Sequence, residues 1–332
     1  MSGPRLTVVV TGASSGVGRA TARAFGARGA NVGLVARGRD GLDAAAKEVE
    51  QAGGRALVLA LDVADADAVA AAAGRVESEL GPIDVWVNCA MAAVLAPVKE
   101  TTAAQLRRVT EVTYLGYVHG TLAALGRMLP RDRGVIVQVG SALSHRAIPL
   151  QAGYCAAKHA IKGFTEALRC ELIHDRSGVR VTMVQLPGLN TPQFDQVATT
   201  LDRHTQPVTP IYQPEVAARA VLWAAEHPRR EVYVGAPTPL VIWAGRLVPG
   251  LVDRYLARTN IEAQQTDEPI PADRPSYLWD PLPGDRGAHG RFDDVAHQRS
   301  LQLVLATHRG AAMSLLALAA AGSVALRQQR RR

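Results

Sequence analysis

The sequence predicts an α/β fold in which a parallel sheet is covered by helices on both faces. Short apolar runs alternate with longer helix-like runs from residue 6 to residue 185. The apolar runs are nearly continuous, which is typical of parallel strands buried on both faces. Hydrophobic residues make up 48% of the 332 residues and aromatic residues only 5%, so small side chains let helices pack closely on the sheet. These observations predict a doubly wound parallel sheet of the Rossmann type, followed by a C-terminal extension.

Each element of the expected sheet is identified by its local pattern. Strands are expected where β-branched and apolar residues form short runs, at residues 6–11, 31–36, 56–62, 83–87, 134–140, 179–185 and 231–234. Helices are expected between them, at residues 16–29, 39–52, 65–80, 103–129, 152–175 and 214–226. The last of these opens with Pro214 and Glu215, which favour a helix N-terminus. Residues 240–256 are apolar and also predict a helix, interrupted at Pro249 and Gly250.

The character of the chain changes after residue 258, which divides it into three expected parts. Residues 1–258 form the cofactor-binding core, and residues 259–309, rich in Pro, Asp and Gln, predict an irregular arm with little core of its own. Residues 310–332 combine seventeen uncharged residues, 310–326, with an arginine-rich end. A helix over residues 310–326 would be about 25 Å long, short of a hydrocarbon core of about 30 Å.

The terminal arginines bear on where such a helix lies. A spanning helix with the core in the cytosol would carry them across the membrane, against the positive-inside bias. A helix in the cytoplasmic interface would instead place them on anionic lipid. Weak membrane-surface contact, packing on protein and a span all stay open.

Charge and cysteine content restrict the classes of partner. The formal net charge is +7, but Arg327, Arg330, Arg331 and Arg332 carry four of these charges, so we expect no nucleic-acid partner. The three cysteines form no CxxC pair, which predicts neither a disulfide nor a metal site and suits a reducing compartment. No apolar leader precedes the first strand. We therefore expect a cytoplasmic protein, with membrane association left open as above.

A glycine-rich segment, Thr-Gly-Ala-Ser-Ser-Gly-Val-Gly, joins the first expected strand to the first expected helix. Gly12 permits a tight turn, Gly16 lets the backbone approach a pyrophosphate, and Gly18 lets the helix and strand pack closely. The helix N-terminus adds free N–H groups for phosphate. A turn without a ligand is the alternative, but the position between strand and helix favours dinucleotide binding. The residues expected to contact the cofactor here are Gly12, Ser14, Ser15, Gly16, Val17 and Gly18.

The end of the second expected strand indicates which nucleotide binds. NAD sites commonly carry an acidic residue at this tip, but Ala36 takes that place and Arg37 follows it. A guanidinium there would pair with a 2′-phosphate, and Arg39 can assist. The sequence therefore predicts NADP(H) as the cofactor, with a simple surface role for Arg37 as the alternative.

The expected catalytic residues are Tyr154 and Lys158, with Ser141 before them. Four residues separate Tyr154 from Lys158, so both share one helix face. A nearby ammonium stabilises a tyrosinate and lowers a phenol pKa that is ordinarily about 10. Such a phenol can exchange a proton with a carbonyl or alcohol oxygen, which Ser141 could also bind. The spacing alone occurs by chance on many helices, so its weight comes from the combination with Ser141 and the glycine-rich segment.

These motifs together resemble the short-chain dehydrogenase/reductase family over roughly residues 5–258. The resemblance implies that Tyr154 is the general acid/base, that Lys158 lowers its pKa and binds the nicotinamide ribose, and that Ser141 orients the substrate oxygen. It implies further cofactor contacts at Asp62, Val63, Asn88 and Ala90. It also implies a homo-oligomer paired through the long helices 103–129 and 152–175.

Three positions depart from the family pattern. Met91 stands where the family has a glycine, and Thr113 stands where a helix asparagine usually completes the catalytic set. The segment from Pro187 to Thr191 is one residue shorter than usual, with Thr191 expected to reach the nicotinamide carboxamide. His145, just past Ser141, is expected in a solvated loop or, less readily, in the substrate pocket.

The expected activity is reversible hydride transfer between NADP(H) and a carbonyl or secondary alcohol, with reduction favoured because this cofactor is usually held reduced in cells. The substrate is expected to be a small molecule, and the apolar C-terminus suggests a hydrophobic one. The alternative is a non-catalytic NADP(H)-binding scaffold or membrane-associated redox sensor. Met91, Thr113 and the arm motivate that alternative, whereas the intact Ser141, Tyr154 and Lys158 argue against it.

Overall fold

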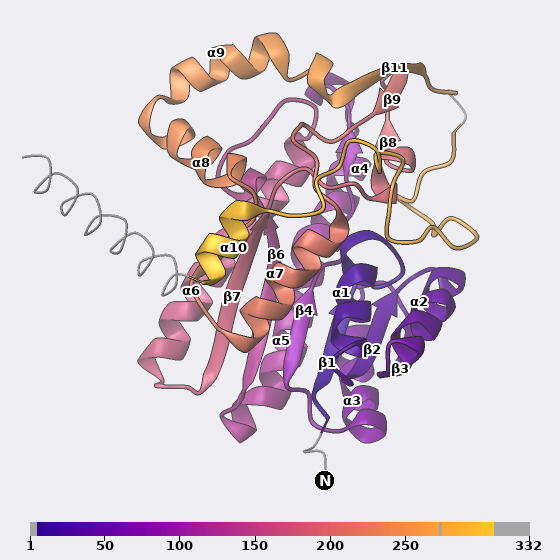
Figure 1. Ribbon diagram of the computed structural model, residues 1–332, viewed down its shortest axis with the longest axis vertical. Coiled ribbons are helices and arrows are strands. Elements are labelled where there is room, and N and C mark those ends of the chain that lie inside the picture. Colours follow the sequence, from indigo (N-terminus) through magenta and orange to yellow (C-terminus); the bar gives the residue numbers. More distant parts are fainter. Residues whose placement is uncertain (1–4, 272–273, 309–332) are drawn as a thin grey trace, which may run out of the picture.

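Seven parallel strands form the central sheet of the computed structural model, which describes residues 5–271 and 274–308 (Figure 1). The strands lie in the order β10-β7-β6-β4-β1-β2-β3, so the chain starts near the middle and winds outward in both directions. Their bounds are β1 Thr7–Thr11, β2 Asn31–Ala36, β3 Arg55–Ala60, β4 Val85–Asn88, β6 Gly134–Ser141, β7 Val179–Leu186 and β10 Glu231–Tyr233. This is the doubly wound α/β fold that the sequence predicts.

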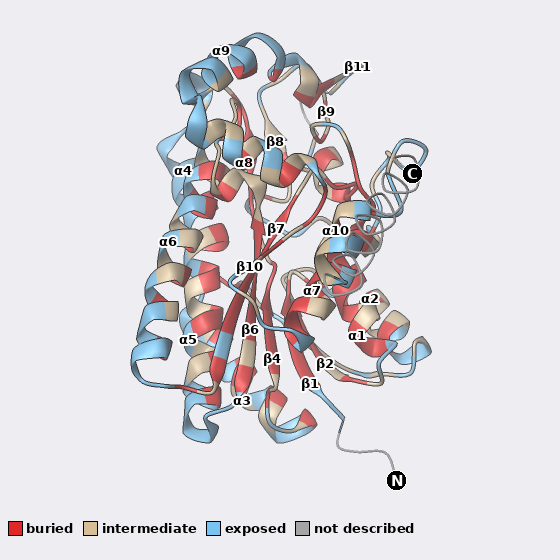
Figure 2. Ribbon diagram, turned by 60° about the vertical axis from the view of Figure 1, so that its left-hand side comes forward, coloured by how far each residue is buried: buried red, intermediate tan, exposed pale blue. Residues whose placement is uncertain are grey.

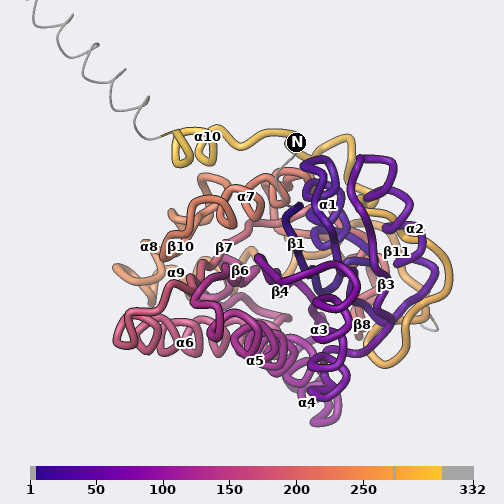
Figure 3. Tube along the Cα trace, turned by 90° about the horizontal axis from the view of Figure 1, so that it is seen from below, coloured from indigo at the N-terminus to yellow at the C-terminus, as the bar shows by residue number. Residues whose placement is uncertain are grey.

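Helices cover both faces of the sheet. Figure 3 shows α1, α2 and α7 on one face and α3, α5 and α6 on the other. The bounds on the first face are α1 Gly16–Gly26, α2 Arg39–Gln51 and α7 Pro214–Glu226. On the second face they are α3 Ala66–Leu80, α4 Ala103–Thr110, α5 Gly116–Met128 and α6 Ala152–His174. Each lies within a few residues of its expected position.

Two apolar clusters hold these layers together, one on each side of the sheet. Along β1, Val8 and Val10 point into the first cluster and Val9 into the second, because strand side chains alternate between faces. All three are fully buried. Figure 2 shows the strands buried along most of their length, which explains why their sequences read as continuous apolar runs.

The long helix expected over residues 103–129 contains one irregular turn. A π-helical turn, Glu111–Leu115, separates α4 from α5. Such turns are rare and often lie near functional sites. Thr113 lies in this turn, so the position where the sequence departs from the family pattern is also a position where the helix widens.

Short elements that the sequence does not predict lie beyond the sheet. Strand β5 Val94–Leu95 pairs with β8 Ala198–Thr199, and β9 Arg203–Thr205 pairs with β11 Gln265–Pro269. Single 3₁₀ turns occupy Val98–Glu100, Leu129–Arg131, Ala142–Ser144, Pro192–Asp195 and Glu262–Gln264. The apolar stretch after β10 forms two helices, α8 Pro237–Leu247 and α9 Pro249–Thr259. The break between them lies at Pro249, as the sequence predicts.

The arm runs back over the body of the protein and ends in α10 Leu301–Thr307. Figure 1 shows its orange and yellow trace passing above α1 and α2. Leu278 and Ala288 of the arm are buried against the body. The helix expected over residues 310–326 lies outside the described residues. Within the described ranges, no helix combines the length and the apolar character that a membrane span needs.

The difference in burial between two leucines predicts a difference in their contributions to stability. Leu34 in β2 is fully buried, whereas Leu240 in α8 is 70% exposed. Leu34→Ala should lower the free energy of unfolding by about 2–5 kcal/mol, because a cavity remains where the side chain packed. Leu240→Ala should change it by less than about 0.5 kcal/mol. Urea unfolding of both variants measures this, and equal effects would contradict the described packing.

Candidate active site

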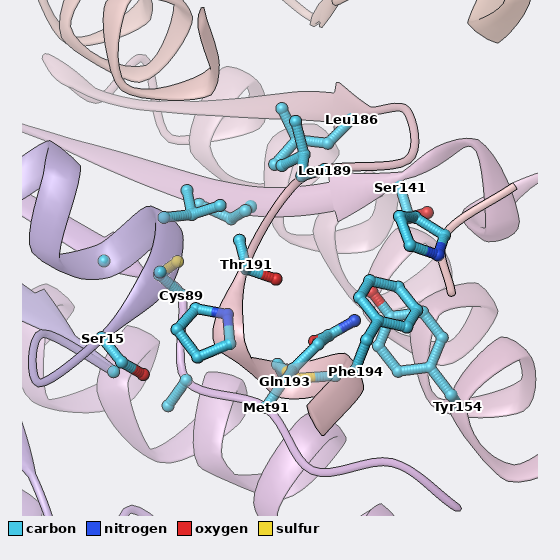
Figure 4. A pocket seen from close by; sticks show the side chains of 18 of the residues that line it. Ser15, Cys89, Met91, Ser141, Tyr154, Leu186, Leu189, Thr191, Gln193 and Phe194 are labelled. Atoms are coloured by element: carbon cyan, nitrogen blue, oxygen red, sulfur yellow. The ribbon is translucent and has the colours of Figure 1, made fainter. Parts of the chain in front are cut away.

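A cavity of about 410 Å³ opens at the carboxyl ends of the parallel strands, where ligands bind in sheets of this topology. Figure 4 shows Ser15 on one side of it and Ser141, Tyr154 and Phe194 on the other. Most residues expected from the sequence line it. They are Gly12, Ser14, Ser15, Gly16, Val17, Gly18, Arg37, Asp62, Val63, Ala90, Ser141, Tyr154, Lys158 and Thr191. Asn88 and Thr113 are absent from this lining and lie buried behind it.

Two positions of the glycine-rich loop have no room for a side chain. Gly12 has φ +70, and a Cβ there would lie 2.8 Å from the Cα of Ala90. A Cβ at Gly18 would lie 2.1 Å from the carbonyl oxygen of Gly12. Ser15 precedes α1 and makes no side-chain capping bond to the helix. The loop therefore brings backbone, a hydroxyl and a helix N-terminus to the cavity wall, which fits the phosphates of a dinucleotide.

The adenine end of the expected site contains a cluster of charges. Asp62 accepts a hydrogen bond of 3.0 Å from the N–H of Ala64 and forms an ion pair with Arg108. Burial opposes ionisation of Asp62, but these bonds outweigh it and lower the pKa of the carboxyl. Arg108 comes from α4, far along the chain, and nothing in its local sequence marks it. It is a residue that sequence reasoning missed.

Arg37 lies at the tip of β2, on the wall of the same cavity. Its guanidinium donates to the carbonyl oxygen of Trp279 at 2.5 Å and to that of Tyr277. Burial, and then the neighbouring Arg108, lower its pKa. Arg37, the residue expected to bind the 2′-phosphate, is therefore partly buried and is already oriented by its hydrogen bonds to the arm.

Lys158 is held beneath the cavity, 2% exposed, by two oxygens. Its ammonium donates to the carbonyl of Val139 at 2.7 Å and to the hydroxyl of Tyr117 at 3.0 Å. The nitrogen lies 4.5 Å from the ring centre of Tyr117 and 5.5 Å from that of Tyr154. Tyr117 is a second residue that the sequence does not reveal, because it is one of two tyrosines on an expected helix and has no motif around it.

Burial is the largest influence on the pKa values of Tyr154 and Lys158. It raises the pKa of Tyr154, and hydrogen bonding by Ser141 lowers it only in part. It lowers the pKa of Lys158 to about 8. The direction for Tyr154 is opposite to the one that the sequence suggests, because the phenolate loses hydration while the ammonium is directed at Tyr117 and Val139.

Thr113 and Asn88 support the site from behind. The hydroxyl of Thr113 donates to the carbonyl of Ala92 at 2.7 Å and accepts from its N–H at 2.8 Å. Asn88 donates to the side chains of Thr121 and Gln138, at 3.1 and 2.9 Å. The Thr113 hydroxyl therefore both donates to and accepts from the backbone of Ala92. The structure places Thr113 as a positioning residue for the segment after β4, away from the cavity wall.

The other two departures from the family pattern do line the cavity. Met91 and Tyr154 pack against the same small apolar cluster, and the Met91 sulfur accepts a weak hydrogen bond of 3.8 Å from the hydroxyl of Tyr277. Its side chain adds apolar surface where a glycine would add none. Thr191 lies in the segment after β7 and lines the cavity. The arm approaches it closely at Gly290, where a Cβ would lie only 2.6 Å from the carbonyl oxygen of Thr191.

His145 is buried, although a solvated loop is the favoured expectation from the sequence. Its side chain is 3% exposed and lies 3.2 Å from the carboxylate of Glu231 on β10. Burial would raise the pKa of Glu231, but hydrogen bonds from His145 and Tyr233 lower it to about 2. The histidine therefore ties the segment after β6 to the edge of the sheet. In the part of the chain that the structure describes, no three His, Cys, Asp or Glu residues gather as a metal site would need.

Comparisons with known proteins agree with this geometry. A family model described as short chain dehydrogenase matches residues 6–202. The chain is 33% identical over 300 residues to the uncharacterized oxidoreductase YxnA of Bacillus subtilis, covering 88% of this chain and 82% of that protein. It is 31% identical over 257 residues to the putative oxidoreductase SadH of Mycobacterium tuberculosis, covering 75% and 93%. It is 36% identical over 223 residues to a cis-4-hydroxycyclohexanecarboxylate dehydrogenase of Sinomonas cyclohexanicum, covering 65% and 88%.

Burial of Lys158 predicts a pH dependence of stability. Its pKa falls from an ordinary 10.5 to about 8 on folding. Between these values the unfolded chain binds more protons, so the free energy of unfolding should rise with pH, by up to about 1.4 kcal/mol per pH unit. Lys158→Met should remove this contribution, so that the variant loses stability relative to the wild type as pH rises above 8.

Urea unfolding of the cofactor-free protein from pH 7 to pH 10 measures the difference between the two proteins. The comparison is needed because burial raises the pKa of Cys89 from 9.0 to about 12, which gives an opposite slope above pH 9. Lys99→Met, at an exposed lysine, is the matched control. Parallel curves for the wild type and Lys158→Met would show that the buried ammonium is not destabilised.

Proposed function

The chain belongs to the short-chain dehydrogenase/reductase family, and from this premise we propose that it is an NADP(H)-dependent enzyme with Tyr154 as its general acid/base. The family establishes the coarser statement: the protein is an oxidoreductase that transfers hydride between a nicotinamide cofactor and a small molecule. One observation carries the finer proposal. Ser141, Tyr154 and Lys158 line the same cavity as the glycine-rich loop and Arg37.

When bound, the nicotinamide supplies or accepts the hydride. The residues of the chain manage the accompanying proton. Ser141 and Tyr154 bind the substrate oxygen, and Tyr154 donates a proton to it in reduction or takes one in oxidation. Lys158, fixed by Val139 and Tyr117, places a positive charge below the ring that becomes a tyrosinate after donation.

The ionisation of Tyr154 supports reduction as the favoured direction. A phenol with its ordinary pKa of about 10 is already protonated at neutral pH, the form that can donate to a carbonyl oxygen, and burial raises the pKa of Tyr154 further. Oxidation would need the tyrosinate, which burial disfavours. A reductive role also agrees with a phosphorylated cofactor that cells usually hold reduced.

Two features support NADP(H) over NAD(H). Ala36 leaves no carboxylate at the tip of β2, and Arg37 places a guanidinium on the cavity wall. Asp62 also lines the cavity, and its ion pair with Arg108 offsets the charge that would repel a 2′-phosphate.

The substrate half of the cavity favours a hydrophobic molecule. Ile148, Phe194, Val241 and Leu256 line it together with the apolar Met91. The name of the Sinomonas relative describes a cyclic secondary alcohol as its substrate, which is the chemical class proposed here. The non-catalytic scaffold is not favoured, because Thr113 acts on the backbone and leaves the catalytic set intact.

Replacing the phenol tests the mechanism. Tyr154→Phe should lower kcat by about 10²–10⁴-fold, because the variant cannot transfer the proton. Binding of NADPH, measured by its fluorescence, should change little. Tyr255→Phe removes the hydroxyl of a tyrosine that is 65% exposed and should keep full activity. Turnover is measured with a panel of cyclic ketones and NADPH, and an active Tyr154→Phe variant would rule out Tyr154 as the acid.

Replacing the guanidinium tests cofactor choice. Arg37→Ala should lower the ratio of kcat/KM for NADPH over NADH by about 10–100-fold, the value of losing charge-assisted hydrogen bonds to a phosphate. The ratio is the proper measure, because any general loosening of the site affects both cofactors alike. Arg39→Ala should shift the ratio less, since Arg39 pairs with Asp43 on the surface. A wild-type enzyme that prefers NADH would contradict the assignment.

A further inference from the structure

Part of the arm, residues 277–290, follows the rim of the cavity from one end to the other. We call these residues the arm segment. Tyr277, Pro281, Leu282, Gly284 and Arg286 of this segment line the cavity together with the glycine-rich loop. We propose that the arm segment is the outer wall of the cofactor site, enclosing the adenosine and phosphates of the dinucleotide and positioning Arg37 for the 2′-phosphate. This inference rests on the proposed function and names a part of the site that lies outside residues 6–202, the range matched by the family model.

At the adenosine end, two arginines hold successive carbonyl groups of the arm segment. Arg37 donates to Tyr277 and Trp279, and Nε of Arg108 donates to Leu278 at 3.1 Å. A guanidinium has five N–H donors, so these bonds fix the orientation of Arg37 and leave donors for a phosphate. Leu278 is 1% exposed and packs into the core, which anchors this end of the segment.

At the phosphate end, the arm segment is bonded to the glycine-rich loop and its helix. The carbonyl of Gly287 accepts the N–H of Gly16 at 3.1 Å, and the N–H of Gly284 donates to Asp40 at 2.8 Å. Asp285 pairs with Arg19, whose side chain is 4% exposed and also pairs with Glu48 at 2.9 Å. These bonds neutralise the charge of Asp285.

Among the described residues Arg286 forms no ion pair; its guanidinium donates to the carbonyl of Pro283 at 3.0 Å, and it lines the cavity together with Gly284. With Asp285 paired, Arg286 is the charge that this part of the segment presents to the cavity. A cation at this position suits the phosphates of the dinucleotide. Arg286 therefore matches the charge of the phosphates, whereas Asp280, nearer the other end of the segment, favours the charge of Arg37.

Beyond the phosphates, the segment is attached to the body at Ala288 and Gly290. Ala288 is 7% exposed and packs against Ala20 of α1 and Ala218 of α7. The N–H of Gly290 donates to the carbonyl of Asn190 at 3.3 Å, beside Thr191 of the cavity wall. Since both ends are fixed, a dinucleotide enclosed by the segment can leave on this side only after these contacts break. Cofactor release should therefore be slow and should depend on the arm.

The test is the rate at which NADPH leaves the full-length protein. The protein is loaded with NADPH, mixed with excess NADP⁺ in a stopped-flow instrument, and followed by NADPH fluorescence. Asp285→Ala removes the ion pair to Arg19, which keeps its pair with Glu48, so the fold should persist. We expect release about tenfold faster, the effect of losing about 1.4 kcal/mol of attachment. Asp285→Glu, which keeps the carboxylate, should restore most of the wild-type rate.

The matched control is Glu268→Ala, which removes an ion pair between Glu268 and Arg291 inside the arm itself. It deletes the same charge without detaching the segment from α1, so it should release NADPH at the wild-type rate. A folded Asp285→Ala variant with wild-type release would overturn the proposal. Equal acceleration in Glu268→Ala would do the same, because the effect would then be one of charge alone.

Hydrogen exchange of the wild-type protein gives an answer that needs no variant. Amides of residues 277–290 should exchange about tenfold more slowly when NADPH is added, whereas those of the distant helix α3 should not change. Unchanged exchange in the arm segment with NADPH bound would overturn the proposal while leaving the proposed function intact. A wild-type protein that binds neither NADPH nor NADH would instead overturn the proposed function, and this inference with it.

Discussion

Contact between the ends of β1 and β4 sets the geometry of the whole site. The hydroxyl of Thr11 accepts the N–H groups of Cys89 and Ala90, at 2.9 and 3.1 Å, so the two strand ends cannot separate. Gly12 then turns away with no room for a Cβ above Ala90. Because α1 begins from this turn, the same contact fixes the helix N-terminus, the glycine-rich loop and the cavity floor. Parallel pairing brings β2, β6 and β7 to the same edge, with Arg37 and Ser141 at their ends.

A fully buried lysine is a costly feature for a fold to keep. Lys158 loses hydration, and its depressed pKa reports that cost. Val139 and Tyr117 supply two oxygens and an aromatic face, which offset it only in part. An apolar side chain would pack there without this penalty, so the arrangement is explained by the charge that it places below Tyr154. The same burial raises the pKa of Tyr154, so it disfavours the charged form of both side chains.

The sequence predicts what local patterns encode and misses what only the tertiary structure brings together. The seven strands and their helices are continuous apolar or periodic runs, so their positions follow within a few residues. Strands β5, β8, β9 and β11 have two to five residues and no pattern of their own. Thr113 lies within the expected helix, but the π-helical turn and the bonds to Ala92 that place it behind the cavity have no local signature. Arg108 and Tyr117 are likewise recognisable only from their partners across the fold.

The arm shows most clearly why distant contacts escape sequence reasoning and why they matter. Arg37 and Trp279 are 242 positions apart, so no spacing rule joins them. Arg108 lies close enough to Arg37 to disfavour the charge of Arg37, so the pair needs negative or acceptor partners before any ligand binds. Asp62 supplies one carboxylate, and the carbonyls of Tyr277, Leu278 and Trp279 supply the remaining acceptors. The carbonyl groups that hold these two arginines belong to the arm segment, so the proposed cofactor selectivity and the proposed closure by the arm depend on the same guanidinium groups.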